Sequence, residues 1–151
     1  MSLNINIKEK LITRCIEMKQ ESEANILAAM EDAQQSANEY GAPKDRYDSF
    51  RAQMMRKRDM LAQQLSVIQE ELRHLRQVKP GNIYTKVETG ALVVLNSQTL
   101  FILVGIGKVE IENTPVYVVS PVVPLVLAMK DLKPGDSFNF RGTEMKIVEI
   151  H

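Results

Sequence analysis

Glycine and proline are almost missing from the first 79 residues of this chain, and this feature constrains the fold most strongly. Of the seven glycines and six prolines in the sequence, only Gly41 and Pro43 lie in that stretch. Because both residue types interrupt helices, the stretch is suited to two long helices joined by a short turn. We expect helices over residues 7–38 and 43–78, with Gly41 ending the first and Pro43 starting the second.

The second expected helix has apolar residues at alternating spacings of three and four, which is the pattern of a coiled-coil seam. The seam comprises Phe50, Met54, Leu61, Leu65, Ile68, Leu72 and Leu75. It has one gap, where Lys57 or Arg58 would fall. The first helix has an apolar stripe diluted by alanine, made of Leu11, Cys15, Met18, Ile26, Ala29 and Ala33. Small residues facing large ones let two helices pack closely, so the pattern predicts an antiparallel helical hairpin in a monomeric protein.

The composition changes at Pro80-Gly81, and we place a boundary there between a helical arm, residues 1–79, and a second domain, residues 80–151. Short β-branched runs predict strands over residues 91–95, 100–105, 108–112, 116–119, 137–140 and 144–150. Residues 121–133 predict one short buried helix with Pro124 in its first turn. The expected fold class is therefore α+β, a helical hairpin followed by a small antiparallel sheet of about five strands with one helix.

Charge and cysteine content exclude several classes of protein. Nineteen basic and nineteen acidic residues give no net charge, so no strong overall field attracts nucleic acid or membrane. A single cysteine, Cys15, allows no internal disulfide and no multi-cysteine zinc site. We find no secretory signal and no apolar run of the ~18 residues that a membrane span needs, and we expect a cytoplasmic protein without membrane contact. His74 and His151 lack partners at metal-ligand spacing, so we expect no metal bound by the free protein and no cofactor of its own.

Three segments of the second half resemble one known family in their order and spacing. The run Gly90-Ala91-Leu92-Val93-Val94-Leu95-Asn96 has a glycine before an alternating apolar strand. Val118-Val119-Ser120-Pro121 precedes an apolar helix that ends in Ala128-Met129-Lys130, and Pro134-Gly135-Asp136 precedes a closing hairpin. With the helical hairpin in front, nearly the whole chain resembles the bacterial Gre-type transcription elongation factors, which are transcript-cleavage factors.

That resemblance implies a function. The second domain would have the FKBP-like fold with which Gre factors dock beside the secondary channel of RNA polymerase, and the hairpin would enter that channel. Acidic residues at the hairpin tip would help to hold a second Mg²⁺ at the polymerase active site, where the polymerase cuts its own backtracked transcript. The factor itself is then an accessory protein and not an enzyme, with RNA polymerase and the nascent RNA as partners.

The tip departs from the family pattern, which is approximately Glu-x-Gly-Asp-Leu-x-Glu-Asn. Aligned on Gly41, the aspartate position holds Ala42, which cannot bind a metal ion, and the glutamate position holds Asp45. Arg46 replaces the asparagine and adds positive charge. Binding with transcript cleavage and binding without it therefore both stay open.

The resemblance carries over to specific tip residues. Asp45 is the candidate metal-directing carboxylate, although an acid near the start of a helix also interacts favourably with the helix dipole. Glu39 and Asp48 are further tip acids that would face the active site or only solvate the turn.

Two further sets of residues are candidate contacts. Arg51, Arg56, Lys57 and Arg58 form a basic stretch that faces RNA or the channel wall, or is only a solvated face. Ser120 and Pro121 are the candidate polymerase-binding residues, and their alternative role is to end a strand and cap a helix.

The heptad seam and the second domain each suggest an alternative function. The heptad seam on residues 61–75 is also suited to a coiled-coil adaptor or chaperone that does not bind polymerase. The FKBP-like domain implied by the resemblance also suggests peptidyl-prolyl isomerase activity as an alternative function. We do not expect this activity, because fold alone does not confer function and aromatic residues are few.

Overall fold

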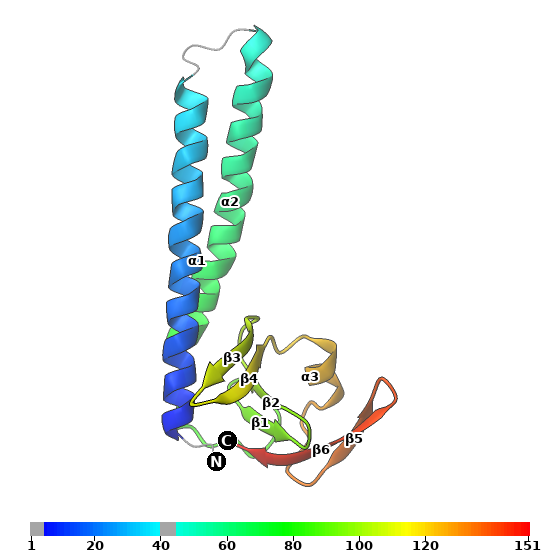
Figure 1. Ribbon diagram of the computed structural model, residues 1–151. Coiled ribbons are helices and arrows are strands. Elements are labelled where there is room, and N and C mark those ends of the chain that lie inside the picture. Colours follow the sequence, from blue (N-terminus) through cyan, green and yellow to red (C-terminus); the bar gives the residue numbers. More distant parts are fainter. Residues whose placement is uncertain (1–4, 40–44) are drawn as a thin grey trace. The chain divides into compact units, whose positions relative to one another are not determined.

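The computed structural model describes residues 5–39 and 45–151, except for the side chains of residues 5 and 45–48 (Figure 1). The chain forms two compact units. One is residues 16–73, and the other joins the described part of residues 1–15 to residues 74–151. The division at residues 79 and 80 that the composition suggests stays a prediction.

The two long helices are α1, Ile5–Glu39, and α2, Asp45–Gln77. They confirm the helical hairpin that the scarcity of glycine and proline predicts. The roles expected for Gly41, Ala42 and Pro43 at the turn lie outside the described residues.

Within residues 16–73 the two helices pack through the predicted seam. Met54, Leu61, Leu65 and Ile68 of α2 are all half-buried, and Leu72 is fully buried. On α1, Ala33 and Ala37 are buried, which keeps the helices close, since alanine fills little space. The seam is thin, so most of its side chains keep some contact with solvent.

Polar contacts across the hairpin fix how the helices are aligned. Lys19 Nζ lies 3.1 Å from Glu71 Oε1, and Arg58 Nη1 donates a hydrogen bond of 2.7 Å to Gln34 Oε1. Arg58 is half-buried and also contacts Asp59, with Nη2 2.9 Å from Oδ1. Arg58 thus occupies the gap in the apolar seam.

The second half of the chain forms one sheet of six strands and a short helix. The strands are β1, Leu92–Leu95; β2, Thr99–Ile102; β3, Gly107–Ile111; β4, Thr114–Val119; β5, Ser137–Phe140; and β6, Thr143–Ile150. Their order across the sheet is β3-β4-β2-β1-β6-β5. The α+β class is confirmed, and every strand overlaps one predicted from the sequence.

The sheet is mixed, whereas the sequence predicted an antiparallel one. β4 runs parallel to β2, with Leu100 opposite Tyr117 and Ile102 opposite Val119. β3 forms a hairpin with β4 and takes the outer edge, which leaves β4 to pair with β2 in the same direction. Alternating apolar residues indicate a strand but not the direction of its partner, so the sequence did not reveal this pair.

Tight turns join the neighbouring strands. Leu95 N donates to Gln98 O at 2.8 Å, which closes the turn between β1 and β2. The turn at Arg141-Gly142, between β5 and β6, has positive φ at both residues, 52° and 81°, as the hairpin turns of type I′ require.

Helix α3, Pro124–Ala128, packs on one face of the sheet (Figure 1). Val126 of this helix and the following Met129 are buried with inward-facing strand residues. These strand residues are Val93, Leu95, Leu100, Ile102 and Ile147. The helix is shorter than the predicted span of residues 121–133, and Pro124 is at its start, as expected.

The first turns of α1 cover the opposite face of the sheet. Phe101 alternates with Leu100 and Ile102 along β2, so its ring is directed away from α3. Lys8 of α1 lies over that ring, with Nζ 5.9 Å from the ring centroid. Ile7 and Leu11 of the same turns are buried. The sheet is thus covered on both faces.

Candidate functional site

The hairpin tip is the first place to look for the function, because the acidic residues singled out from the sequence lie there. Glu39 is the last residue of α1 and is exposed. The backbone of α2 begins at Asp45, and the side chains of Asp45 and Asp48 lie outside the described residues. An acid at the C-terminal end of a helix is disfavoured by roughly 0.3–1 kcal/mol. Glu39 therefore does not stabilise its own helix.

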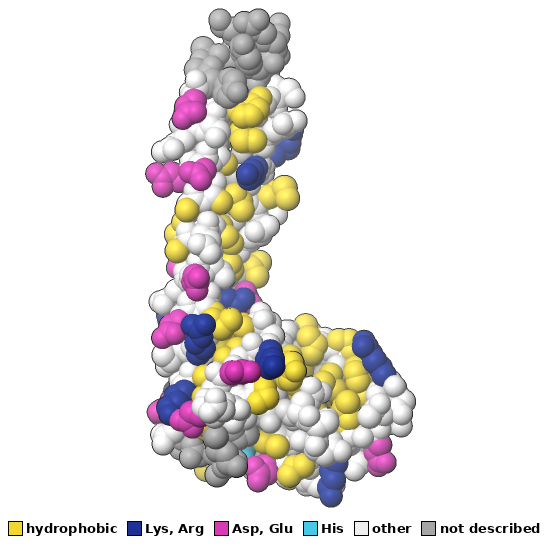
Figure 2. All heavy atoms as spheres, viewed as in Figure 1, with side chains coloured by type: hydrophobic (Ala, Val, Ile, Leu, Met, Phe, Trp, Pro, Cys, Tyr) yellow, Lys and Arg dark blue, Asp and Glu magenta, His cyan; other side chains and the backbone are white. Residues whose placement is uncertain are grey.

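The basic stretch on α2 divides into two kinds of residue. Arg56 and Lys57 are exposed, whereas Arg51 and Arg58 are half-buried. Arg58 is held by Gln34 and Asp59 in the hairpin seam. Figure 2 shows basic side chains on the surface of the arm. Of the four basic residues, Arg56 and Lys57 are the more exposed to a partner.

Ser120 and Pro121 follow strand β4 and form a turn ahead of α3. Ser120 Oγ accepts a hydrogen bond of 3.3 Å from Val122 N, and Ser120 O accepts one of 3.4 Å from Val123 N. Val123 is the N-cap of α3 and Pro124 is its first residue. Ser120 and Pro121 therefore shape the turn and do not cap the helix, which corrects the structural role considered for them from the sequence.

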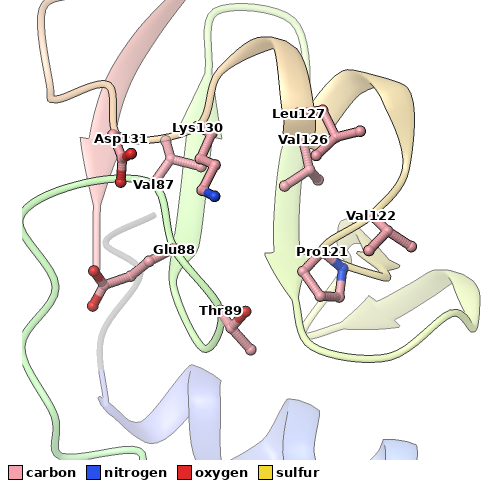
Figure 3. Close-up of a pocket in the computed structure, with 9 residues that line it drawn as sticks. All are labelled: Val87, Glu88, Thr89, Pro121, Val122, Val126, Leu127, Lys130 and Asp131. Carbon is pink, nitrogen blue, oxygen red and sulfur yellow. The ribbon is translucent and has the colours of Figure 1, made fainter.

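This turn borders a groove of about 300 Å³ (Figure 3). Val87 and Val126 are buried in it, while Val122 and Leu127 are 71% and 56% exposed. The groove also includes Pro121, Thr89, Glu88, Lys130 and Asp131. Its lining is largely apolar and contains no aromatic ring.

One wall of the groove could not be found from the sequence. Residues 87–89 come from the segment before β1, more than thirty residues from the turn at Pro121. Val87 is anchored there by two backbone hydrogen bonds, from its N to Leu132 O at 2.9 Å and from Asp131 N to its O at 3.1 Å. Lys86 Nζ lies 3.4 Å from Asp131 Oδ1 and 3.9 Å from Glu88 Oε2, so the charged rim is cross-linked by ion pairs.

A buried lysine, Lys8, is a further feature that the sequence pattern does not indicate. Lys8 is 1% exposed, and its Nζ donates a hydrogen bond of 3.1 Å to the backbone oxygen of His151. The ring of Tyr84 lies 4.4 Å from the ammonium nitrogen, so cation–π attraction offsets part of the lost hydration. Burial lowers the pKa of Lys8 from 10.5 to about 8. At this burial Lys8 is closed to any substrate, and its contacts hold α1 to the sheet.

The described residues show neither a metal centre nor a membrane span. In residues 5–39 and 45–151, no three His, Cys, Asp or Glu side chains come together in a way that could hold a metal ion. Within the same residues, no helix is both long enough and apolar enough to cross a membrane.

Comparisons with known proteins find solved structures of low similarity. No protein-family model matches the chain, and no curated protein matches it either. A crystal structure of GreA factor homolog 1 (Gfh1) of Thermus thermophilus matches at 15% identity, covering 94% of this chain and 93% of that one, with a TM-score of 0.34. A structure described as the transcription factor Gfh1 matches at 16% identity, covering 90% and 92%, with a TM-score of 0.33. The crystal structure of Thermus aquaticus Gfh1 matches at 14% identity, covering 95% and 93%, with a TM-score of 0.33. The likeness extends over nearly the full length of these chains, and no residue role follows from it.

Proposed function

We propose that this protein is a Gre-like regulator of transcription elongation that binds RNA polymerase and inserts its helical hairpin into the secondary channel. The observation that supports this most is the hairpin itself, formed by helices of 35 and 33 residues. The segment that joins these helices is flanked by the acidic residues Glu39 and Asp45. A thin arm with acids at its end is suited to delivering carboxylates into a narrow site that a globular domain cannot enter.

The chemistry would belong to the polymerase. Mg²⁺ prefers oxygen ligands, and a second metal ion stabilises both the attacking and the leaving oxygen when a phosphodiester is cut. Asp45 is the carboxylate that we assign to this role, with Glu39 and Asp48 beside it in sequence. Arg56 and Lys57 would contact the transcript or the channel wall, and the protein acts as an accessory factor in the cytoplasm.

Ala42 favours a second form of the same function. A methyl group at the position where Gre factors have an aspartate removes one ligand from the acidic pair. A protein with one carboxylate would occupy the channel and modulate the polymerase without efficient cleavage. We therefore propose channel binding as the common property and leave cleavage to the experiment below.

The groove beside Ser120 and Pro121 is the surface that we assign to docking on the polymerase. Exposed Val122 and Leu127 offer apolar contact area, and Lys130 at the rim adds a charge that fixes orientation. The absence of aromatic side chains from this lining disfavours prolyl isomerase activity, for which a proline-peptide assay should find no catalysis.

The test uses cognate RNA polymerase stalled in a backtracked complex with end-labelled RNA. We would add the protein with Mg²⁺, follow shortening of the RNA and record binding in the same samples. Shortening that Asp45→Asn abolishes would support the cleaving form. Binding without shortening, together with cleavage gained in Ala42→Asp, would support the non-cleaving form.

A variant of the groove separates docking from chemistry. Leu127→Lys places a charge on the apolar surface and should weaken binding, while the exposed Lys133→Ala outside the groove should not. Failure of the unaltered protein to bind polymerase would contradict the proposal and favour the coiled-coil adaptor.

A further inference from the structure

The middle of the helical arm contains no charged residue in either helix. Residues 24–30 of α1 are Ala-Asn-Ile-Leu-Ala-Ala-Met, and residues 60–69 of α2 are Met-Leu-Ala-Gln-Gln-Leu-Ser-Val-Ile-Gln. We call these two segments the neutral band. Charged residues border it on both sides, with Glu23 and Glu31 on α1 and Asp59 and Glu70 on α2.

The two segments lie at the same level of the hairpin. Lys19 contacts Glu71 on one side of the band, and Gln34 contacts Arg58 on the other. Since α1 and α2 run antiparallel between these two contacts, residues 24–30 lie beside residues 61–67. At 1.5 Å per residue the band is roughly 15 Å long.

Large apolar side chains of the band are directed into solvent. Leu27 is 48% exposed, Met60 is 62% exposed and Val67 is 60% exposed. Exposed residues of a helical hairpin are expected to be polar or charged, because such side chains keep the surface soluble. Among the described side chains of residues 16–73, Leu27, Met60 and Val67 are the large apolar ones that are exposed, and all three lie in the band.

These side chains lie on opposite faces of the hairpin. The hydrogen bond between Arg58 and Gln34 crosses the seam on one face. Leu27 is seven residues before Gln34 and therefore shares its stripe and its face. Met60 is two residues after Arg58, about 200° round the helix, so it is directed to the other face, and Val67 is seven residues further along the same stripe.

This arrangement decides between kinds of partner. Proteins bind nucleic acid mainly through basic side chains that contact its phosphates, and the band has no basic side chain. A second copy of the chain would cover one face. One face of the band, roughly 15 Å long and about 20 Å across two helices, has an area of ~300 Å², which is below the ~800 Å² per partner of a stable protein interface. A protein surface that encloses the arm would bury both faces together.

We infer that the neutral band is the part of the arm that an enclosing, weakly charged protein wall surrounds, and that this wall belongs to the polymerase channel. This inference rests on the proposed function, and it identifies the residues of the arm that would contact the channel wall. Leu27, Met60 and Val67 would pack against the wall, and the neutral Gln63 and Gln64 beside them would let the arm slide in without losing ion pairs.

The test introduces one charge on each face and compares each with a matched site on the same stripe outside the band. Leu27→Lys is paired with Gln20→Lys, and Val67→Lys with His74→Lys, both control positions being exposed and on the side of the band away from the tip. Lysine is a good helix former, and circular dichroism would verify that all four variants keep their helix content. Binding is measured on immobilised RNA polymerase free of nucleic acid.

We expect each band variant to bind about tenfold more weakly or worse, because a lysine enclosed by apolar protein loses hydration, and each control to stay within about twofold. Band variants that bind like the unaltered protein would overturn this inference and leave the proposed function intact. An unaltered protein that does not bind polymerase would overturn both. Sensitivity at one face only, with a dimer in sedimentation that the same variant dissociates, would replace the channel wall by a second copy of the chain.

Discussion

Lys8 is a charged residue in a buried environment, and its pKa departs from the ordinary value of a lysine. Its ammonium is buried against Tyr84 and Phe101 and donates a hydrogen bond to the backbone oxygen of His151. Desolvation penalises the charged form, which lowers the pKa of Lys8 to about 8, while the rings and the oxygen favour the charge. Nothing in the sequence around Asn6–Lys10 distinguishes this lysine from an exposed one, because its partners lie far along the chain.

The lowered pKa of Lys8 predicts that stability rises at alkaline pH. Between about 8 and 10.5 the unfolded chain keeps a proton that the folded chain has lost, so the free energy of unfolding increases with pH across that window. Lys8→Met should remove up to about 3 kcal/mol of this increase. Urea unfolding at several pH values from 7 to 10 would measure it, with the exposed Lys79→Met as control. An identical pH dependence in Lys8→Met and the unaltered protein would contradict the burial of the charge.

Gly90, which lies just before strand β1, occupies a position that other residues fit poorly. Its φ is +93°, and a Cβ there would lie 2.5 Å from Tyr84 Oη. Gly90→Ala should therefore destabilise the protein twice over, through backbone strain of ~1 kcal/mol or more and through displacement of Tyr84 from Lys8. Gly135→Ala is a matched control, because φ is +94° there and a Cβ would have no neighbour within 4 Å. Equal losses of unfolding free energy in the two variants would show that the contact with Tyr84 has no effect.

At the scale of the elements, the helical hairpin was the easiest part to predict and the groove the hardest. A seam and a glycine-poor stretch are local patterns, so the extent of α1 and α2 follows from residue spacing. The groove is assembled from residues 87–89 and 121–131, which pattern analysis treats separately. The parallel pairing of β2 and β4 was missed for the same reason, since it depends on where β3 folds.

The gap in the seam at Arg58 gives a prediction for the arm. Arg58→Leu would extend the apolar seam between Met54 and Leu61, so we expect the free energy of unfolding to rise by ~0.5–1 kcal/mol, because a half-buried apolar side chain replaces a half-buried charge. Thermal unfolding followed by circular dichroism would measure the change, with the exposed Arg56→Leu as control. A lower midpoint for Arg58→Leu than for Arg56→Leu would mean that the hydrogen bond to Gln34 outweighs the apolar contact.

At the scale of the whole molecule, the composition and the contacts divide the chain differently. Glycine and proline content changes at Pro80, whereas the contacts group the first turns of α1 with the sheet. Lys8, Ile7 and Leu11 belong to a long helix by local pattern and to the second half of the chain by burial. The apolar pattern of a long amphipathic helix does not indicate at which residue its apolar face stops packing on the sheet and starts packing on the other helix.

The hydrogen bond between Lys8 and His151 also has a consequence for folding during synthesis of the chain. The hydrogen bond joins residues 143 positions apart, and Phe101 and Tyr84 lie between them in the sequence. A ribosome releases the first turns of α1 long before it has made the strands that cover them. The first turns of α1, which include Ile7, Lys8 and Leu11, therefore stay exposed to water during most of synthesis. The charge on Lys8 helps to keep this segment soluble until strand β6 has been made.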